Sequence, residues 1–383
     1  MIKFYKLFFM KEYKSGKYIS QGTYKSFQPE NINRQWEINN MELLNLLSQA
    51  DRHLGRLDMY SEYIPNLDLF TSMHVLKEAT QSSKIEGTKT NIEEALLNKE
   101  DIVEEKKDDW EEIQNYISAL NSSINKLKDL PFSSRLIKHA HKILLKGVRG
   151  KHKSPGAFRS TQNWIGGASI ADAVFIPPIA SSINSYMGDL EKFTHSDKFL
   201  MPDLLKIALI HYQFETIHPF LDGNGRVGRL LITLYLVEKK ILKNPILYLS
   251  DFFERNKTLY YDNLMRVREK NDITQWFKFF LVGVIETAKG SVETFDSILK
   301  LQKEVDNKLQ TLGNRYNNAH AVIQQLYQHP LIDVQKTKEV TSLSLPSVYK
   351  LIDDMERLNI IKEITGGKRG KLYVFEKYIK LFR

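Results

Sequence analysis

The segment from residue 218 to residue 229 carries the groups best suited to do chemistry. It reads His218-Pro-Phe-Leu-Asp222-Gly-Asn-Gly-Arg226-Val-Gly-Arg229. An imidazole that is neutral near pH 7 can take a proton from a hydroxyl group. A carboxylate four residues further on is a hard oxygen ligand of the kind that Mg²⁺ prefers. The segment therefore predicts a general base beside a magnesium ligand.

The second half of the same segment is suited to phosphate. Gly223, Asn224 and Gly225 form a turn that opens a helix, where free backbone N–H groups bind anions and glycine lets the chain approach phosphate oxygens closely. Arg226 and Arg229 lie on adjacent positions of that helix and can clamp one polyphosphate. Together with the imidazole, these residues predict a nucleotide-phosphate site with a built-in base.

Two other interpretations of this segment are weaker. Gly223, Gly225 and Gly228 match the spacing of a dinucleotide-binding fingerprint, but that fingerprint requires a preceding strand and a βαβ unit. Here a helical stretch and His218-Pro219 precede the glycines. A purely structural turn with a core histidine would suit a lone His, but this segment holds His, Asp, Gly, Asn, Gly, Arg and Arg together.

The segment resembles the signature of the Fic family, His-x-Phe-x-Asp/Glu-Gly-Asn-Gly-Arg-x-x-Arg, and every fixed position of that signature is present. The resemblance implies an all-helical core and transfer of AMP from ATP to a protein hydroxyl. It implies that His218 deprotonates a target Ser, Thr or Tyr and that Asp222 holds Mg²⁺ on the α- and β-phosphates. The hydroxyl would then attack the α-phosphorus and pyrophosphate would leave.

The other nucleotide-binding residues come from the same resemblance. The turn would cradle phosphate, and the two arginines would reach the outer phosphates: Gly223, Asn224, Gly225, Arg226 and Arg229. Tyr260 and Tyr261 resemble a tyrosine pair that lines the adenine end, although two tyrosines on a helix are often part of a core. A sister branch that phosphorylates its target usually has Lys in place of Gly225, so the glycine favours AMP transfer.

Residues 154 to 178 resemble the family's flap. They contain Pro155-Gly-Ala-Phe-Arg159, Asn163-Trp-Ile-Gly166 and Val174-Phe-Ile-Pro-Pro178. The apolar run 170–176 is bounded by turn residues and predicts a small β-hairpin. A target protein would present its hydroxyl near the flap at 165–178 by pairing its main chain with the flap edge. A structural hairpin without a partner is the alternative.

Ser82-Ser-Lys-Ile-Glu86-Gly87 matches a second motif of the family, Ser/Thr-x-x-x-Glu-Gly/Asn. The resemblance implies that Glu86 reaches into the nucleotide site and pairs with Arg229, so that the γ-phosphate cannot dock productively. A carboxylate and a phosphate would compete for one charge-assisted contact. The hypothesis is autoinhibition within the chain; an ordinary solvated glutamate near a helix end is the alternative.

Helices must position these groups. Apolar residues recur at helical spacing in the stretches 32–57, 69–84, 136–148, 203–216, 226–240, 259–268 and 274–289. The predicted fold class is mainly α: a Fic-type helical core with a small β-hairpin flap, an N-terminal helical region and a C-terminal winged helix-turn-helix. The predicted domains are an N-terminal arm (1–30), the N-terminal helical region with the inhibitory motif (31–110), the Fic catalytic core (111–310) and the winged helix-turn-helix (314–383).

The predicted C-terminal domain has a separate character. Helical stretches at 319–328 and 347–358 precede a Gly-rich hairpin with the basic residues Lys368, Arg369 and Lys371, a pattern typical of a winged helix-turn-helix. Residues 315–383 hold twelve Lys or Arg against seven Asp or Glu, which favours phosphate contacts. Asp353 and Asp354 on the proposed recognition helix are acidic and would repel phosphate, so docking of DNA and docking of a protein both stay open.

The composition excludes several classes of chemistry. Cysteine is absent, which rules out disulfides, zinc-thiolate sites and a cysteine nucleophile. His139, His141 and His211 complete no metal set and are expected to be structural. The net charge of +9 allows an anionic partner without requiring one.

We expect a cytoplasmic protein with no membrane partner, because no stretch approaches the roughly 20 apolar residues that span a bilayer and no signal-peptide cleavage site follows the N-terminus. Self-modification and a homodimer stay open. The competing hypotheses for function are a DNA-binding regulator whose Fic core senses a nucleotide, an enzyme that removes AMP, and an enzyme that transfers a phosphoryl group.

Overall fold

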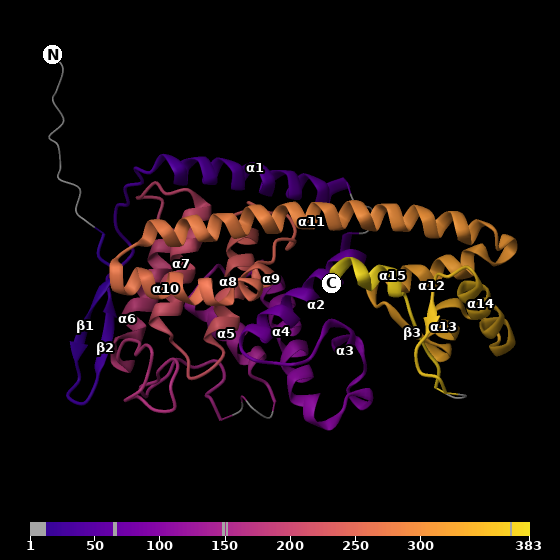
Figure 1. Ribbon diagram of the computed structural model, residues 1–383, viewed down its shortest axis with the longest axis horizontal. Helices are drawn as coiled ribbons and strands as arrows, with labels where there is room; N and C mark the ends of the chain where they lie inside the picture. Colours follow the sequence, from indigo (N-terminus) through magenta and orange to yellow (C-terminus); the bar gives the residue numbers. More distant parts are fainter. Residues whose placement is uncertain (1–12, 64–66, 148–149, 151, 368–369) are drawn as a thin grey trace, which may run out of the picture.

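The computed structural model describes residues 13–63, 67–147, 150, 152–367 and 370–383 (Figure 1). The fold is mainly α-helical, as the sequence predicts. The first part of the chain contains β1 (Gly16–Ser20), β2 (Lys25–Pro29), α1 (Met41–Tyr63), α2 (Leu67–Ile85), α3 (Ile92–Leu96), η1 (Lys99–Asp101), η2 (Glu104–Lys106), α4 (Lys107–Lys126) and α5 (Ser134–Leu144). The middle part contains η3 (Ala180–Ser182), α6 (Ile183–His195), α7 (Asp203–Ile217), α8 (Asn224–Glu238), α9 (Ser250–Arg255), α10 (Lys257–Lys270) and α11 (Ile273–Gln310). The last part contains η4 (Gly313–Arg315), α12 (Tyr316–Gln328), β3 (Leu331–Asp333), α13 (Val334–Thr341), α14 (Leu345–Arg357), β4 (Lys362–Glu363), β5 (Leu372–Val374), α15 (Glu376–Ile379) and η5 (Lys380–Phe382).

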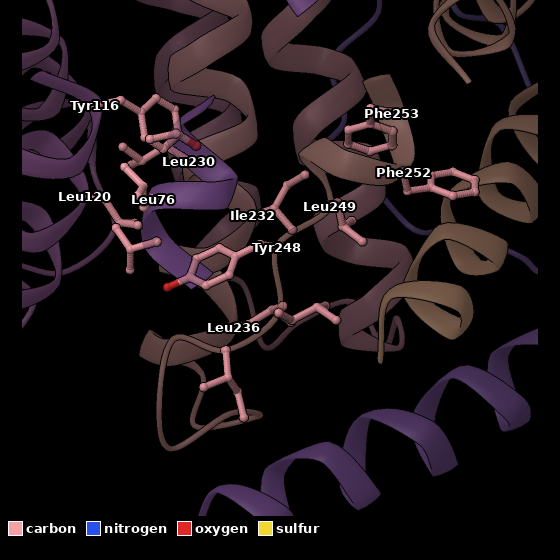
Figure 2. Packing of buried hydrophobic residues seen from close by; sticks show 14 of the residues in the cluster. Leu76, Tyr116, Leu120, Leu230, Ile232, Leu236, Tyr248, Leu249, Phe252 and Phe253 are labelled. Carbon is pink, nitrogen blue, oxygen red and sulfur yellow. The ribbon is translucent and has the colours of Figure 1, made fainter. Parts of the chain in front are cut away.

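Helices α7 and α8 form the centre of the molecule. Every residue from 204 to 217 of α7 is buried, because apolar side chains occupy most of its faces and α6, α8 and α11 pack against it. Figure 2 shows α8 side chains among those of α2, α4 and α9: Leu230, Ile232 and Leu236 with Leu76, Tyr116, Leu120, Phe252 and Phe253. The loop of residues 218–223 joins these two buried helices, so both of its ends are anchored in the core.

Helices α1 and α11 lie side by side over this centre (Figure 1). Helix α11 runs for 38 residues, much further than the stretch 274–289 that the sequence predicts. It continues because Val292, Phe295, Ile298 and Leu301 extend the buried apolar stripe beyond residue 289. None of the described helices, α11 included, is both long enough and apolar enough to cross a membrane.

The predicted arm folds, in its described part, into an antiparallel hairpin of β1 and β2. Phe27 of β2 is buried and its N–H donates to the carbonyl of Ile176 (2.8 Å). Its ring packs against Phe175 at a centroid distance of 5.8 Å. The hairpin therefore supports the base of the flap. Residues 1–12 of the predicted arm lie outside the described residues.

The flap is a loop closed by one antiparallel bridge, so the small β-hairpin that the sequence predicts is confined to a single pair of residues. Ile165 and Phe175 form an isolated antiparallel bridge. Beyond it, the Asp172 carboxylate accepts the N–H groups of Ala168 (2.9 Å) and Ser169 (2.7 Å), which folds the tip into a turn that competes with strand pairing. Val174 stays 65% exposed.

The C-terminal part follows the order of elements expected for a winged helix-turn-helix. Helices α12, α13 and α14 pack together, and the sheet has the strand order β3-β5-β4 with antiparallel pairs. The predicted wing-tip residues Lys368 and Arg369 lie outside the described residues.

This C-terminal part packs directly on α2. The hydroxyl of Ser72 donates to the carbonyl of Gln328 at the end of α12 (2.9 Å). The ring of His74 packs against Phe382 near the end of the chain, with centroids 5.0 Å apart. Helix α2 thus connects the C-terminal part to the segment that carries Glu86.

Candidate active site

The loop between α7 and α8 is held in shape by its own side chains. His218 ends α7 in the left-handed region (φ 51°), and Gly223 precedes α8 at φ 72°. The Oδ1 atom of Asn224 accepts the N–H of Phe220 (2.8 Å), and its Nδ2 donates to the carbonyl of Phe220 (2.9 Å). Because both ends of the Asn224 side chain are used inside the loop, what Asn224 can offer an anion is its backbone N–H at the helix N-terminus.

The guanidinium of Arg159 ties the flap to this loop. Arg159 is buried, and its Nε donates to the carbonyl of His218 (2.9 Å). Its Nη1 donates to the carbonyl of Thr161 (3.0 Å) and its Nη2 to that of Pro178 (2.5 Å). Since the donors of a guanidinium form a rigid planar fork, one side chain sets the positions of three carbonyl groups. The backbone of His218 is therefore fixed relative to both ends of the flap.

The imidazole of His218 is neutral at pH 7. Burial, followed by the nearby guanidinium groups of Arg268 and Arg159, lowers its pKa to about 3. A neutral ring has a lone pair free to accept a proton, which is the form that a general base requires.

Asp222 presents a carboxylate at the N-terminal end of α8. Its Oδ1 accepts the N–H of Gly223 (2.5 Å) and lies 3.6 Å from Nη2 of Arg226. The side chain is 42% exposed, so its other oxygen can reach a ligand in solution.

His141 of α5 holds the backbone of Asp222. The N–H of Gly156 donates to its Nδ1 (2.8 Å), so the proton is on Nε2, which donates to the carbonyl of Asp222 (3.1 Å). The ring also stacks on Phe220 with centroids 3.7 Å apart. His141 is structural, as the sequence predicts, and the structure it supports is the loop itself.

Arg229 of α8 is buried and bound by the end of α2. Its Nη2 donates to Oε1 of Glu86 (2.7 Å) and to the carbonyl of Ser82 (2.8 Å), and its Nε donates to the hydroxyl of Ser82 (2.9 Å). Burial opposes ionisation of Glu86, but the charge and hydrogen bond of Arg229 outweigh it, so the pKa of the Glu86 carboxyl is lowered. The carboxylate is therefore ionised at neutral pH and pairs with Arg229.

The carboxylate of Glu86 lies directly over Gly225. A Cβ atom added at Gly225 would come within 2.3 Å of Oε1 of Glu86 and 2.9 Å of Nη1 of Arg229. Glycine at this position therefore leaves room for the carboxylate at the N-terminus of α8, where an anionic ligand would also bind.

Helix α2 is fixed by a buried carboxylate two turns before Glu86. Glu78 accepts the hydroxyl of Tyr116 from α4 (2.9 Å) and both the hydroxyl (2.6 Å) and the N–H (3.1 Å) of Ser250 from α9. At the helix end, Nζ of Lys257 donates to the carbonyl of Ile85 (2.5 Å). These contacts place Glu86 within reach of Arg229.

Arg226 is paired with a second carboxylate from the N-terminal helices. Its Nη1 lies 2.8 Å from Oε2 of Glu112 on α4, and the Arg226 side chain is only 5% exposed. Both arginines that the sequence assigns to phosphate are thus bound by glutamates of α4 and of the segment after α2.

Comparison with known proteins identifies the family. Residues 44–125 match the description "Fic/DOC family N-terminal", and residues 131–236 match "Fic/DOC family". The two ranges span about half of the chain and include Glu86 and the whole segment from His218 to Arg229. The chain belongs to the Fic/DOC family.

Several Fic/DOC relatives are named as adenylyltransferases. A probable protein adenylyltransferase of Aquifex aeolicus (strain VF5) is 27% identical over 251 residues, which are 62% of this chain and 70% of that protein. The protein adenylyltransferase Fic of Culex quinquefasciatus is 32% identical over 125 residues, which are 32% of this chain. This second match spans about a fifth of the insect protein's length, 22%.

A solved structure shares the fold. A Fic family protein from Desulfovibrio desulfuricans G20 superposes with a TM-score of 0.56 at 18% identity, over 89% of this chain and 98% of that chain. At this identity the similarity is one of fold.

The two tyrosines assigned to the adenine end of the Fic/DOC site lie in different environments. Tyr260 is buried, its hydroxyl bonds to Nε2 of His211 (2.8 Å), and its ring stacks on Phe253 at 4.6 Å. Tyr261 is 39% exposed. Tyr260 therefore packs as a core residue, which agrees with the core alternative, and Tyr261 is the tyrosine whose ring a ligand can reach.

Several site residues were not found from the sequence. From the sequence, Arg159 is assigned only to the flap, and Glu112 is assigned to no site. Glu112 lies three residues after the buried Asp109 and next to the buried Ile113, and this position gives no signal that it faces the motif arginine. Its role depends on how α4 packs against α8.

Replacing Glu112 with Ala should lower the free energy of unfolding by about 1–3 kcal/mol, because Arg226 would lose the nearer of its two carboxylate partners while its Nε is already buried without a hydrogen bond in the described part of the chain. Denaturant titration followed by circular dichroism measures the change. Glu105→Ala, at an exposed position of η2 just before α4, is the matched control and should change the free energy of unfolding by less than about 0.5 kcal/mol. Equal effects of the two substitutions would contradict this account.

Glu215 makes stability depend on pH. Burial raises its pKa to about 7, against an ordinary value of 4.5, and it faces Arg229, Arg268 and Glu86. The folded state binds the Glu215 proton more tightly than the unfolded state does. The stabilisation of the folded state by this proton is therefore complete below the pKa of the unfolded state and is lost as the pH rises through about 7. We therefore expect the melting temperature of the wild type to fall relative to that of Glu215→Gln over this range.

Differential scanning fluorimetry of both proteins at a series of pH values tests this expectation. Other titrating groups are common to the two proteins and cancel in the difference. Parallel pH profiles would show that Glu215 ionises normally.

Proposed function

We propose that this Fic/DOC chain transfers AMP from ATP to the hydroxyl group of a Ser, Thr or Tyr on a target protein. The observation that carries the proposal is the convergence of a neutral imidazole, a helix N-terminus and two arginines on one loop. The named relatives support a transferase of this family. The target is a protein in the names of those relatives, and we extend that class of target to this chain.

In the proposed reaction, His218 takes the proton from the target hydroxyl. The oxygen attacks the α-phosphorus of ATP and forms a new P–O bond, while the bond from that phosphorus to the bridging oxygen breaks and pyrophosphate leaves. The N–H groups at the start of α8 and the side chains of Arg226 and Arg229 would stabilise the phosphate charges. Arg159 keeps the backbone of His218 in place and acts as a positioning residue.

The residues present fit a magnesium ion. Mg²⁺ usually binds proteins through one or two carboxylates and completes its coordination with waters and substrate phosphates, and Asp222 offers one half-exposed carboxylate beside the helix N-terminus. Within the described ranges, no cluster of three or more acidic or imidazole groups could hold a metal by itself. When bound, the ion would neutralise charge on the phosphates.

We further propose that the adenine ring lies against Tyr261, with Tyr260 behind it in the core. The target chain would pair with the edge of the flap near the Ile165–Phe175 bridge, where Val174 and Trp164 are exposed. Main-chain pairing of this kind gives affinity with little demand on the target's sequence.

Glu86 is proposed to inhibit the transfer within the chain. Its carboxylate occupies Arg229 and covers Gly225, so a γ-phosphate would have to displace it. The Glu86 carboxylate and the γ-phosphate are both anions, so they would compete directly for Arg229.

Mass spectrometry after incubation with ATP and Mg²⁺ tests the proposed function. The Glu86→Gly variant should add AMP to itself or to a protein in a lysate. Addition of a phosphate alone would show phosphoryl transfer, and loss of AMP from a premodified protein would show the reverse activity. No modification by either protein, together with tight DNA binding, would favour the nucleotide-sensing regulator.

A further inference from the structure

A groove of about 670 Å³ lies between the end of α4, helix α5 and the turn at Pro155 and Gly156. Five of its lining residues are basic and one is acidic: Lys126, Arg135, Lys138, His139 and Lys142 against Asp129. The groove is therefore an electropositive concave surface.

Within the part of the chain that the structure describes, four basic side chains of this groove have no ion-pair partner. Of the described residues, none forms an ion pair with Lys126, Arg135, Lys138 or Lys142. Lys138 lies over the ring of Phe158 with Nζ 4.1 Å from its centroid. Burial, and then the charges of Lys126 and Lys142, lower the pKa of His139, as expected where a further positive charge is unfavourable. An anionic partner would relieve this repulsion.

The groove is connected to the candidate active site by short contacts. Gly156 at its edge donates to His141, and His141 donates to the carbonyl of Asp222. Three residues after Gly156, the N–H of Arg159 donates to the carbonyl of Pro219 (2.9 Å). One imidazole therefore separates the groove from the loop that holds the proposed base, and the chain leads directly from the groove into the flap.

We propose that this groove binds an acidic segment of the target protein, so that the enzyme selects hydroxyl groups near clustered Asp and Glu residues. The inference rests on the proposed function and names a substrate class for the same site. A target held by its main chain at the flap has little sequence specificity, and a charged groove beside the flap would supply specificity and faster encounter.

A polypeptide fits this surface better than a nucleic acid does. Proteins that bind single-stranded nucleic acid combine a basic groove with aromatic side chains on which bases stack. The residues that line this groove include no Phe, Tyr or Trp. Carboxylates of an acidic peptide need only the ammonium and guanidinium donors that are present.

Fluorescence anisotropy with a labelled oligoglutamate peptide tests the groove without any reaction. A variant with Lys126→Glu, Arg135→Glu and Lys142→Glu changes three exposed residues. We expect it to bind the peptide about tenfold more weakly than the wild type, since each exposed pair contributes modestly, and we expect wild-type binding to weaken with salt. An oligoglutamine peptide should bind weakly to both proteins.

The matched control carries Lys300→Glu, Lys303→Glu and Lys350→Glu, which change the net charge equally on exposed positions of α11 and α14. Equal binding by the two triple variants would overturn the proposal. So would a single-stranded RNA that binds the wild type more tightly than oligoglutamate and displaces it. Circular dichroism melting curves confirm that each variant is folded.

A second measurement separates this proposal from the proposed function. In the Glu86→Gly background, AMP transfer to a serine flanked by glutamates is compared with transfer to one flanked by glutamines. We expect a preference for the acidic peptide of about tenfold that the groove variant loses. Transfer without preference and without oligoglutamate binding would remove the groove proposal alone. Peptide binding that depends on the groove, with no AMP transfer to any acceptor, would contradict the proposed AMP transfer and leave the groove proposal standing.

Discussion

In a Glu86→Gly background, replacement of His218 with Ala should reduce AMP transfer by about 10²- to 10⁴-fold, which is the usual contribution of a general base. The ring is neutral because burial and two guanidinium groups lower its pKa to about 3, so it accepts the hydroxyl proton at pH 7. Labelled ATP and a fixed acceptor measure the rate. ATP affinity should stay within a few-fold of the parent, because the phosphates are assigned to α8 and its arginines.

The pH profile gives an independent test of the same residue. A histidine with an ordinary pKa of 6.5 would lose activity as the pH falls through that value, because the protonated ring cannot accept a proton. With a pKa of about 3, His218 should give no such loss between about pH 6 and pH 8. His53→Ala on α1, far along the chain from this loop, is the matched control for histidine removal. Full activity of the His218→Ala variant would contradict the proposed role of His218 as the general base.

Replacement of Glu86 with Gly should raise AMP transfer by on the order of 10- to 100-fold. The carboxylate forms a charge-assisted hydrogen bond with Arg229 (2.7 Å), and such bonds contribute about 1.5–3 kcal/mol. Once it is removed, a γ-phosphate no longer has to displace it. Arg229 keeps its two contacts with Ser82, so the guanidinium should stay where a phosphate can reach it.

Glu86→Gln provides a graded control for this prediction. An amide oxygen can still accept a hydrogen bond from Arg229 but has no charge, so its activation should be intermediate between wild type and Glu86→Gly. Glu100→Gly, at an exposed position of η1, should leave the rate unchanged. Equal rates for wild type and Glu86→Gly, with ATP bound by both, would show that the pairing does not inhibit.

The Glu86→Gly variant should be less stable than the wild type, although it transfers AMP faster. Arg229 has a side-chain exposure of 1%, and removal of its charged partner leaves a buried guanidinium with neutral acceptors. The free energy of unfolding of Glu86→Gly should therefore fall by about 1–3 kcal/mol. A more active protein that is also less stable would match a contact retained for regulation.

The sequence predicted which chemical groups the loop carries, but it did not predict the contacts that hold the loop in place. His218, Asp222, Gly225 and Arg229 are close in the chain, so their spacing on one turn and one helix could be worked out directly. The turn assigned to phosphate offers its backbone at Asn224, because the structure uses the Asn224 side chain to close the loop on Phe220. A local pattern shows which atoms are near one another, but not which atoms already have partners.

The flap and α11 show where local patterns misled. The apolar run 170–176, bounded by turn residues, predicts a small β-hairpin, but Asp172 accepts the N–H groups of Ala168 and Ser169 at the tip and the pairing is limited to one bridge. Helix α11 continues beyond its predicted end because its later apolar residues face the C-terminal part as well as the core. In the flap a neighbouring side chain decided the outcome, and in α11 packing against other elements decided it.

By itself, the sequence determined the helical class of the fold and the set of groups available to one loop, because periodicity and short spacings depend on neighbours along the chain. The tertiary structure decided which of those groups are already bound to other residues of the chain. Three contacts join residues that are at least 59 positions apart in the sequence: the pairing of Arg226 with Glu112, the placement of Glu86 over Gly225, and the restraint of His218 by Arg159. Such contacts are set by how buried helices pack, and packing depends on the whole core rather than on any one segment.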